Sequence, residues 1–583
     1  MADLTEKIIR SEEEQNAATA GHHETHLAAP ELASSRSDSD VEADTEAKDA
    51  EKVKTHEDTH KGNLVRRVTT EGEDYLPPGP KLYLIVASLM LCVFCVALDN
   101  TILAVAIPRI TDDFHSLNDV GWYISVYLLT SCAFQLFFGK IYSLFSVKWI
   151  YLGGLFIFEI GSLICALSPN STVLIVGRAI AGLGSGGIFS GALITIAKTV
   201  ELSQRPIYFG LIGGMYGIAS VAGPLMGGAF TDKLTWRWCF YINLPIGGAA
   251  AAGLLFFLKL REKAAYKYET TTSIIKKLDL LGTTFFVAAI VCVLLALQWG
   301  GTMYPYSDGR IIALFVLFGV LLIGFIGLQI YFKEDALVPP RIITQRTVAF
   351  ASLFGACVGG SFFIFVYYVP IWFQAIKGVS PVIAGVDSLP LILANVFATI
   401  TSGVIVSKTG HYVPFFYISV VLQAIGAGLL CTFTPDTSQA AWVGYQFLYA
   451  LGMGCGFQQT TVAAQAVLAT RDVSVGTAVV LFIEIFGGAL FVAVAQNLFT
   501  NALIQKVAEL NIPGLDPQII VAAGATGFRN IVKPENLPAV LVAYNAAIVK
   551  AFQLGLILSC LAIFGAVGLE FKTLKGKPVA AAA

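Results

Sequence analysis

Five ionisable side chains lie within long apolar stretches of the sequence, where a charge is costly. They are Asp99, Glu159, Arg178, Asp387 and Glu484. If these stretches cross a bilayer, each charge costs at least about 2.5 kcal/mol on insertion scales. An acid in such a place can take up and release a proton, and a neighbouring cation can set the pH at which it does so. Proton transfer is therefore the chemistry that these residue types favour.

Asp99 and Arg178 are predicted to lie at the same depth in the membrane. Asp99 precedes the outer end of the first predicted span by fewer than about ten residues, and Arg178 follows the outer start of the fourth by a similarly small number. Both side chains would then lie roughly 10 to 14 Å below the outer surface, where they can pair. Two interpretations stay open. The pair is either a structural ion pair that fixes helix packing or a proton site in which Arg178 tunes Asp99.

Buried amides are candidates for hydrogen bonds to a bound molecule. Asn395, Gln458 and Gln459 each fall within a predicted span. A few such polar groups orient a small ligand in an otherwise apolar pocket. The alternative is that they join helices through interhelical hydrogen bonds.

The composition of the chain indicates a membrane protein with many spans. Its 583 residues are 56% hydrophobic and only 13% charged, against roughly 25% charged in globular proteins. The ten cysteines lie in or beside apolar runs, and five of the seven histidines precede the first run. No disulfide framework or metal site follows from this distribution. The sequence also lacks a phosphate-binding loop and a catalytic nucleophile arrangement, so we expect neither an ATPase, nor an enzyme, nor a cofactor.

Apolar runs of about 20 residues predict fourteen membrane helices. They cover residues 82–106, 121–139, 149–167, 173–196, 207–229, 239–258, 280–299, 311–332, 348–372, 382–406, 413–433, 441–466, 476–500 and 549–570. The loops that follow even-numbered spans, with the 259–279 connection, carry fifteen lysines and arginines, whereas the opposite short loops carry five. An excess of positive charge marks cytosolic loops, so both termini are predicted to be cytosolic.

Two short turns indicate an internal repeat. GKIYSLFSVKW begins at Gly139 after the second span, and GVIVSKTGHYVPF begins at Gly403 after the tenth. Chance similarity of two polar turns is the alternative to two related six-helix halves around an inserted pair. The first 80 residues hold 19 acidic and 9 basic residues, a balance typical of a disordered tail. The predicted order is a disordered cytosolic tail 1–80, an N-terminal six-helix bundle 81–258, a cytosolic linker 259–279, an inserted helix pair 280–332, a C-terminal six-helix bundle 333–570 with an outer loop 501–548, and a cytosolic tail 571–583.

The fifth span, GLIGGMYGIASVAGPLMGG from Gly210, is unusually rich in glycine. Glycines at four-residue spacing leave a flat stripe against which another helix can pack closely. Gly223, Pro224, Gly227 and Gly228 are predicted to form a bend in this helix, about which two halves of a transporter could rock. A plain packing interface is the alternative.

Four segments together resemble a known family. They are LDNTILAVAIP from Leu98, RAIAGLGSGG from Arg178, GIASVAGPLMGG from Gly217 and LTWRWCFYINLPIGG from Leu234. The chain resembles the fourteen-span drug:H+ antiporters of the major facilitator superfamily, and is similar to the fungal pumps that export aflatoxin or gliotoxin. One departure is that Ser143 and Ser146 stand where many major facilitators have aspartate and glycine, which puts the gating role of that turn in doubt.

The resemblance implies an all-α membrane protein with the major facilitator fold, in which Asp99 and Arg178 couple export to protons. It also places Glu484 and Asp387 on helices that line the substrate cavity, with Glu484 as a second proton site or a contact for a basic substrate group. The alternative for Asp387 is a position at the membrane interface, in contact with water. Glu159 would lie outside the cavity. The expected partners are a small, largely apolar molecule, protons and the lipid bilayer, with no nucleic acid, and the expected state is a monomer.

The function expected from these features is proton-coupled efflux of a secondary metabolite, toxin or drug by alternating access. A siderophore or nutrient porter of the same fold and a non-transporting membrane sensor are the alternatives. The plasma membrane is the expected location, with the vacuolar membrane as the alternative. Asn170 begins an N-x-S/T acceptor on the outer side, although its loop is short for a glycosylation site.

Overall fold

The computed structural model describes residues 76, 79–116, 119–259, 277–301 and 303–575. The chain divides into two units, Met1–Leu64 and Val65–Ala583, and every described residue belongs to the second. The predicted tail 1–80 lies almost wholly outside the described residues, as do most of the linker 259–279 and the end of the tail 571–583.

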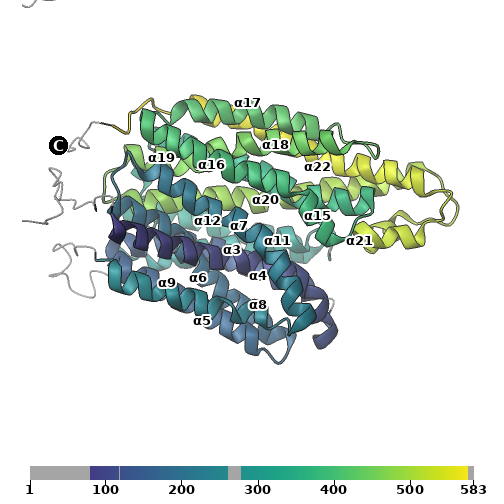
Figure 1. Ribbon diagram of the computed structural model, residues 1–583, viewed down its shortest axis with the longest axis horizontal. Helices are drawn as coiled ribbons and strands as arrows, with labels where there is room; N and C mark the ends of the chain where they lie inside the picture. The colour runs from purple at the N-terminus through teal and green to yellow at the C-terminus, as the bar shows by residue number, and fades with distance from the viewer. Residues whose placement is uncertain (1–75, 77–78, 117–118, 260–276, 302, 576–583) are drawn as a thin grey trace, which may run out of the picture. The chain divides into compact units, whose positions relative to one another are not determined.

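Helices make up the regular structure of the described part (Figure 1). The first group is α3 (Pro80–Phe114), α4 (Val120–Leu144), α5 (Val147–Leu167), α6 (Ser171–Thr199), α7 (Arg205–Lys233), α8 (Trp238–Tyr241) and α9 (Asn243–Phe257). Next come α11 (Leu280–Trp299), α12 (Gly309–Phe332), η3 (Lys333–Asp335) and α13 (Pro340–Ile343). The last group is α14 (Arg346–Trp372), η4 (Phe373–Lys377), α15 (Pro381–Asp387), α16 (Leu389–Thr409), α17 (Val413–Leu430), α18 (Gln439–Gly456), α19 (Gln459–Val467), α20 (Val473–Glu509), α21 (Pro517–Ile531) and α22 (Leu537–Val567).

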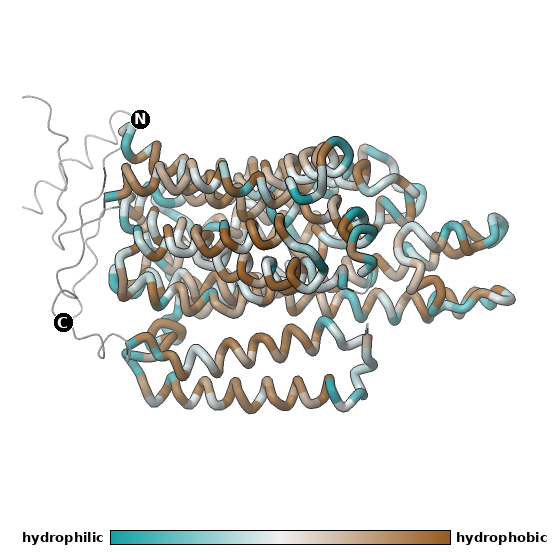
Figure 2. The backbone as a smooth tube through the Cα atoms, turned by 90° about the horizontal axis from the view of Figure 1, so that it is seen from below, coloured by the Kyte–Doolittle hydropathy of each residue, from teal (hydrophilic) through white to brown (hydrophobic). Residues whose placement is uncertain are grey.

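Apolar composition explains why these segments are helical. Within the described residues, 13 helices are long and apolar enough to cross a membrane. Brown, hydrophobic stretches occupy the middle of the helices, and teal, hydrophilic residues gather toward their ends (Figure 2). A helix satisfies its own backbone hydrogen bonds, which a bilayer cannot do for it. The protein is therefore an all-α, multi-pass membrane protein.

Two predicted spans differ from the helices observed. The span predicted at 441–466 is two helices, α18 and α19, which meet at Phe457 and Gln458 and are not among the 13 apolar helices. The last helix begins at Leu537, twelve residues before the predicted 549. Helices occupy much of the predicted outer loop 501–548, because α20 continues to Glu509, α21 covers Pro517–Ile531 and α22 begins at Leu537. Its position outside the membrane stays a prediction. The total of fourteen spans stays a prediction.

Helix contacts fall mainly within two sets. In the first, α5 and α4 pack on α6, and both α7 and α9 pack on α3. In the second, α20 and α22 pack on α14, and both α16 and α17 pack on α18. The two sets meet where α7 packs on α16 and α4 packs on α20. The pair α11 and α12 pack on each other, and α11 also contacts α4 and α20.

The glycine-rich helix α7 has Pro224 in its interior. Near this proline, α7 packs closely on α3. A Cβ on Gly223 would overlap the Thr101 side chain, and one on Gly227 would lie 2.9 Å from the carbonyl oxygen of Ile102. By contrast, a Cβ on Gly228 would meet nothing within 4 Å. The stripe is thus a close helix contact at Gly223 and Gly227, while rocking about Pro224 stays a prediction.

The other end of α7 packs against α16, between the two sets of helices. A Cβ on Gly210 would lie 2.9 Å from the carbonyl oxygen of Thr399. On α16, a Cβ on Gly403 would overlap the carbonyl oxygen of Pro206. Gly139 at the corresponding end of α4 similarly abuts Ala478 of α20. Both turns that the sequence singled out as a repeat therefore begin at a glycine that joins the two sets.

Candidate functional site

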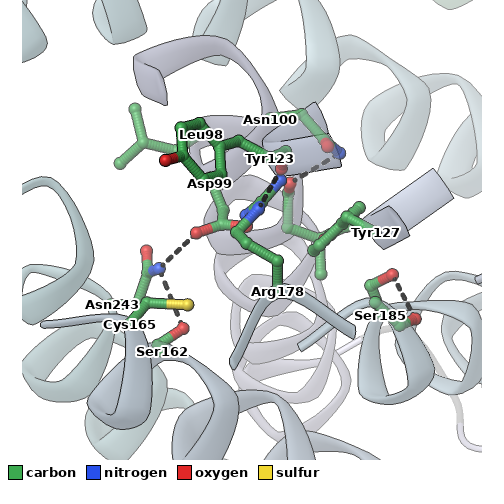
Figure 3. Close-up of polar contacts among 12 residues, drawn as sticks. Leu98, Asp99, Asn100, Tyr123, Tyr127, Ser162, Cys165, Arg178, Ser185 and Asn243 are labelled. Carbon is green, nitrogen blue, oxygen red and sulfur yellow. Dashed lines mark hydrogen bonds and ion pairs between the residues drawn. The ribbon is translucent and has the colours of Figure 1, made fainter. Parts of the chain in front are cut away.

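Asp99 and Arg178 form a fully buried ion pair between α3 and α6. Nη1 of Arg178 donates to Oδ2 of Asp99 (Figure 3), and both residues have 0% of their surface exposed. The two residues are 79 positions apart in the chain. The sequence placed them at one depth, and the fold brings them into contact.

Helix α4 holds the Arg178 side chain in place. Nε of Arg178 donates to the backbone oxygen of Tyr123 over 2.8 Å, and the guanidinium carbon lies 4.3 Å from the ring centre of Tyr127 (Figure 3). The cation–π contact is favourable where water is excluded. Gly182 and Gly186 permit this approach, since a Cβ on either would come too close to the α4 backbone. The small residues of α6 thus bring the cation close to α4.

Asn243 is a third member of the site that the sequence analysis missed. Its Nδ2 donates to Oδ1 of Asp99 over 3.1 Å and to Oγ of Ser162 over 3.2 Å (Figure 3). Asn243 is the first residue of α9 and is fully buried. A polar amide beside the apolar run LPIGG was the available signal, but the motif was read only as a family resemblance. Asp99 therefore has a cation on one oxygen and an amide on the other.

The pair is costly to keep, and its hydrogen bonding is incomplete. Removing two charges from water is offset only by close geometry and additional hydrogen bonds. Nη2 of Arg178 and Oδ1 of Asn243 are buried and have no hydrogen-bond partner among the described residues. Because proteins leave few buried polar atoms unpaired, such atoms often mark functional sites. The arrangement can hold one proton on Asp99 at the cost of weakening its contact with Arg178.

Glu484 lies in a separate environment within the second set of helices. It is 2% exposed, and Oγ1 of Thr460 donates to its Oε2 over 3.2 Å. Gly355 and Gly359 of α14 leave room for its side chain. No cation is recorded against it within the described residues. A lone carboxyl in such a place is more stable protonated.

Among the described residues, no hydrogen bond joins Asn395, Gln458 and Gln459 to one another. Asn395 packs against Gly454 of α18, and its backbone oxygen accepts from Thr399 over 2.7 Å. Gln458 faces α7, where its Nε2 would lie 2.7 Å from a Cβ on Gly213. The hydrogen bonds of Asn395 lie within α16, so its role in binding a ligand or joining helices stays a prediction.

Three further sequence candidates lie apart from the ion pair. Gln459 is 1% exposed, and its Oε1 has no hydrogen-bond partner in the described part of the chain. Asp387 is partly exposed at the end of α15, and its backbone oxygen accepts from Gln446 over 3.1 Å. Asn170 is exposed as the N-cap of α6 and accepts from the Val173 amide over 3.0 Å. The roles assigned to all three stay predictions.

Comparison with known proteins identifies the family. A family model described as the Major Facilitator Superfamily matches residues 89–493. This chain is a major facilitator. It is 60% identical over 497 residues to the efflux pump aflT of Aspergillus parasiticus, covering 85% of this chain and 97% of that pump. It is also 55% identical over 505 residues to the MFS-type efflux pump MFS1 of Trichophyton rubrum, covering 87% and 94%.

Other comparisons agree with this assignment. The efflux pump roqT of Penicillium rubens is 48% identical over 508 residues, covering 87% of this chain and 94% of that pump. The crystal structure of the human organic anion transporter MFSD10 gives a TM-score of 0.52 at 13% identity, covering 82% of this chain and 100% of that one. The structural likeness shows the fold alone. As a major facilitator, the protein is a membrane transporter and not an enzyme.

The predicted cytosolic end of this facilitator is tied together by the segment that follows the inserted pair. Nζ of Lys140 on α4 donates to the backbone oxygens of Asp335 and Ala336 over 3.2 and 2.6 Å. Asp279, which caps α11, accepts from the Leu337 amide over 2.7 Å and from Gln329 over 3.0 Å. The short segment after α12 is thereby bound to α4 and to the start of α11.

Arg341 connects the same segment to α20. Its Nη1 and Nη2 donate to the two carboxylate oxygens of Asp472 over 2.6 and 2.8 Å, and its Nε donates to Glu334 over 2.8 Å. The hydrogen bonds that Arg341 donates to Asp472 and Glu334 raise its pKa above the ordinary value, against the opposing effect of burial. Arg341 therefore stays charged throughout the physiological range. Lys140 and Arg341 thus connect the segment after α12 to α4 and to Asp472 at the start of α20.

Replacing Arg341 by glutamine is expected to loosen this end of the facilitator. The contact is partly exposed, so its loss should cost about 1 kcal/mol and raise the open population about fivefold. A cysteine placed at Ser474, which is 1% exposed, would report this in a background without native cysteines. Its reaction with a membrane-impermeant maleimide should speed up by that factor. The exchanged pair Arg341→Asp and Asp472→Arg should restore slow labelling, and equal rates in all variants would contradict the expectation.

Proposed function

We propose that this facilitator exports a small, largely apolar secondary metabolite or toxin in exchange for protons. The buried contact between Asp99 and Arg178 carries the proposal, because it places one protonatable acid in a dry interface beside one fixed cation. Three relatives with 48% to 60% identity are named efflux pumps, which supports export over import. We further propose a location in the plasma membrane, both termini in the cytosol and a monomeric state.

The proposed cycle uses alternating exposure of one central site. Protonation of Asp99 from the outer side removes its negative charge and weakens its ion pair with Arg178. The two sets of helices then change their relative packing, and loss of the proton toward the cytosol restores the ion pair. A proton gradient thereby drives the substrate outward. Glu484 serves as a second group that holds a proton, within the second set of helices.

Replacing Asp99 by asparagine tests the proposal. Proteoliposomes with an imposed pH gradient should accumulate the dye rhodamine 6G through the wild-type protein, and a proton ionophore should abolish this accumulation. The Asp99→Asn protein should lose at least about tenfold in gradient-driven uptake, because the amide cannot exchange a proton. Asp112→Asn is the matched control, since Asp112 is an exposed acid on the same helix. Gradient-driven uptake that persists in Asp99→Asn would overturn the proposal.

A further inference from the structure

Glu159 lies next to the ion pair, although the sequence analysis left it out of the mechanism. It is on α5, three residues before Ser162, whose hydroxyl accepts from Asn243. The carboxyl of Glu159 lies over Gly247 of α9, so closely that a Cβ on that glycine would overlap Oε1. Gly247 follows Asn243 by one helical turn. Both α5 and α9 therefore place Glu159 one turn beyond the Asn243 contact with Asp99.

The carboxyl of Glu159 is unusual because no ion pair or hydrogen bond to it is found within the described part of the chain. Both of its oxygens are buried and have no hydrogen-bond partner among the described residues. Asp99 lies close enough for the two charges to interact. The cluster thus contains two acids and one cation, Arg178, which already pairs with Asp99. Two negative charges beside one cation are unfavourable in a buried interface.

Among the residues that the structure describes, the other groups around Glu159 do not supply a second cation. On α3, the side chains that interact with it are Asp99 and the neutral thiols of Cys92 and Cys95. On α6, Arg178 is engaged by Asp99. Helix α9, from Asn243 to Phe257, has no titratable side chain. On α5 itself, Tyr151 lies on the same face as Glu159 and nearer the start of the helix. A proton is accordingly the group available to neutralise Glu159.

The direction of the helices gives this pair of acids an order along the membrane. Helix α3 begins at the predicted cytosolic end, and so does α5, while α9 begins at the opposite end. Glu159 precedes Ser162 on α5, and Gly247 follows Asn243 on α9. On both helices, then, Glu159 is one turn nearer the predicted cytosolic side than the contact made by Asp99.

We propose that Glu159 is a further proton-carrying carboxyl, distinct from Glu484, which receives the proton of Asp99 and passes it on along a route lined by α3, α5 and α9. This inference rests on the proposed proton-coupled export. In the transfer, the O–H bond of Asp99 breaks and one O–H bond forms on Glu159. Asp99 regains the negative charge that pairs with Arg178, and Glu159 becomes neutral. The hydroxyl of Ser162, three residues after Glu159, accepts from the same Asn243 amide that donates to Asp99.

The variant Glu159→Gln keeps the shape of the side chain and removes its ability to carry a proton. We expect gradient-driven accumulation of rhodamine 6G to fall about five- to tenfold. Exchange of labelled for unlabelled dye, which moves no net proton, should stay within twofold of wild type. Glu159→Asp should recover part of the driven uptake. A merely structural role would instead lower both activities together, and Glu509→Gln, an exposed acid, is the control.

Adjacent glycines provide a second test that leaves the carboxyl in place. Gly247→Ala adds a methyl group where the Glu159 carboxyl lies, whereas a Cβ on Gly248 would meet nothing within 4 Å. Driven uptake should fall in Gly247→Ala and stay normal in Gly248→Ala. An infrared difference spectrum between low and high pH should also show a protonated-carboxyl band that Glu159→Gln lacks.

The possible outcomes separate the two proposals. If the wild type shows no gradient-driven uptake, the proposed function itself fails. Suppose instead that the wild type shows gradient-driven uptake, and that Glu159→Gln keeps this uptake within twofold and retains the infrared band. The inference about Glu159 is then wrong, while the proposed function stands.

Discussion

Replacing Arg178 by alanine is expected to destabilise the folded protein by about 3–5 kcal/mol and to abolish driven transport. The reason is that Asp99, which is fully buried, would be left without its cation, and an uncompensated buried charge costs about this much. The hydrogen bond to Tyr123 and the contact with the Tyr127 ring would be lost as well. Thermal unfolding in detergent, followed by the monodisperse fraction of a fluorescent fusion, measures the first effect. Uptake of rhodamine 6G into proteoliposomes measures the second.

A double variant distinguishes the structural from the functional part of this loss. Asp99→Asn combined with Arg178→Gln removes both charges, so most of the stability should return while driven transport stays absent. Arg310→Ala is the control, because Arg310 is exposed at the start of α12. A normal unfolding temperature for Arg178→Ala would show that the ion pair does not stabilise the fold.

The second large effect is expected where α16 meets α7. Changing Gly403 to valine should reduce transport at least tenfold without reducing the amount of protein in the membrane. Any Cβ at this position would overlap the carbonyl oxygen of Pro206, and overpacking a close contact costs about 1–3 kcal/mol. The cost falls on the arrangement in which this end is closed, so the open arrangement gains population.

Labelling and a matched glycine make this expectation testable. In Gly403→Val, a cysteine at Ser474 should react faster with a membrane-impermeant maleimide than in the wild-type background. Gly428→Val is the control, since a Cβ there would meet nothing within 4 Å. If Gly403→Val transports normally, the close contact between α7 and α16 has no part in the cycle.

The sequence predicts those features that depend on the composition of a single segment. A run of about 20 apolar residues must be helical in a bilayer, because only a helix satisfies its own backbone hydrogen bonds there. Most predicted spans therefore match helices to within several residues. The sequence also predicts how deep a residue lies in the membrane, because its distance along the helix from the end of the span sets that depth. That is why Asp99 and Arg178 could be matched before the structure placed them in contact.

The helix break at Phe457 and the long ends of α20 and α22 were less accessible. Hydropathy finds where a membrane core begins, but a helix can continue beyond it. The Thr and Gln residues of α19 lower its hydropathy, and neighbouring helices bury them. Contacts with other helices, and not local composition, set these boundaries.

What only the tertiary structure decided is which face of each helix points at which neighbour. In a soluble helix a polar face marks the outside, but in a bilayer the lipid-facing and protein-facing sides are both apolar. The sequence therefore determined the helices, their depth and their charged residues. Folding determined that Asn243 binds Asp99 across 144 residues, that Glu159 lies over Gly247, and that Lys140 reaches the segment after α12. Those contacts depend on the rotation of each helix about its axis, which close packing fixes and hydrophobicity does not.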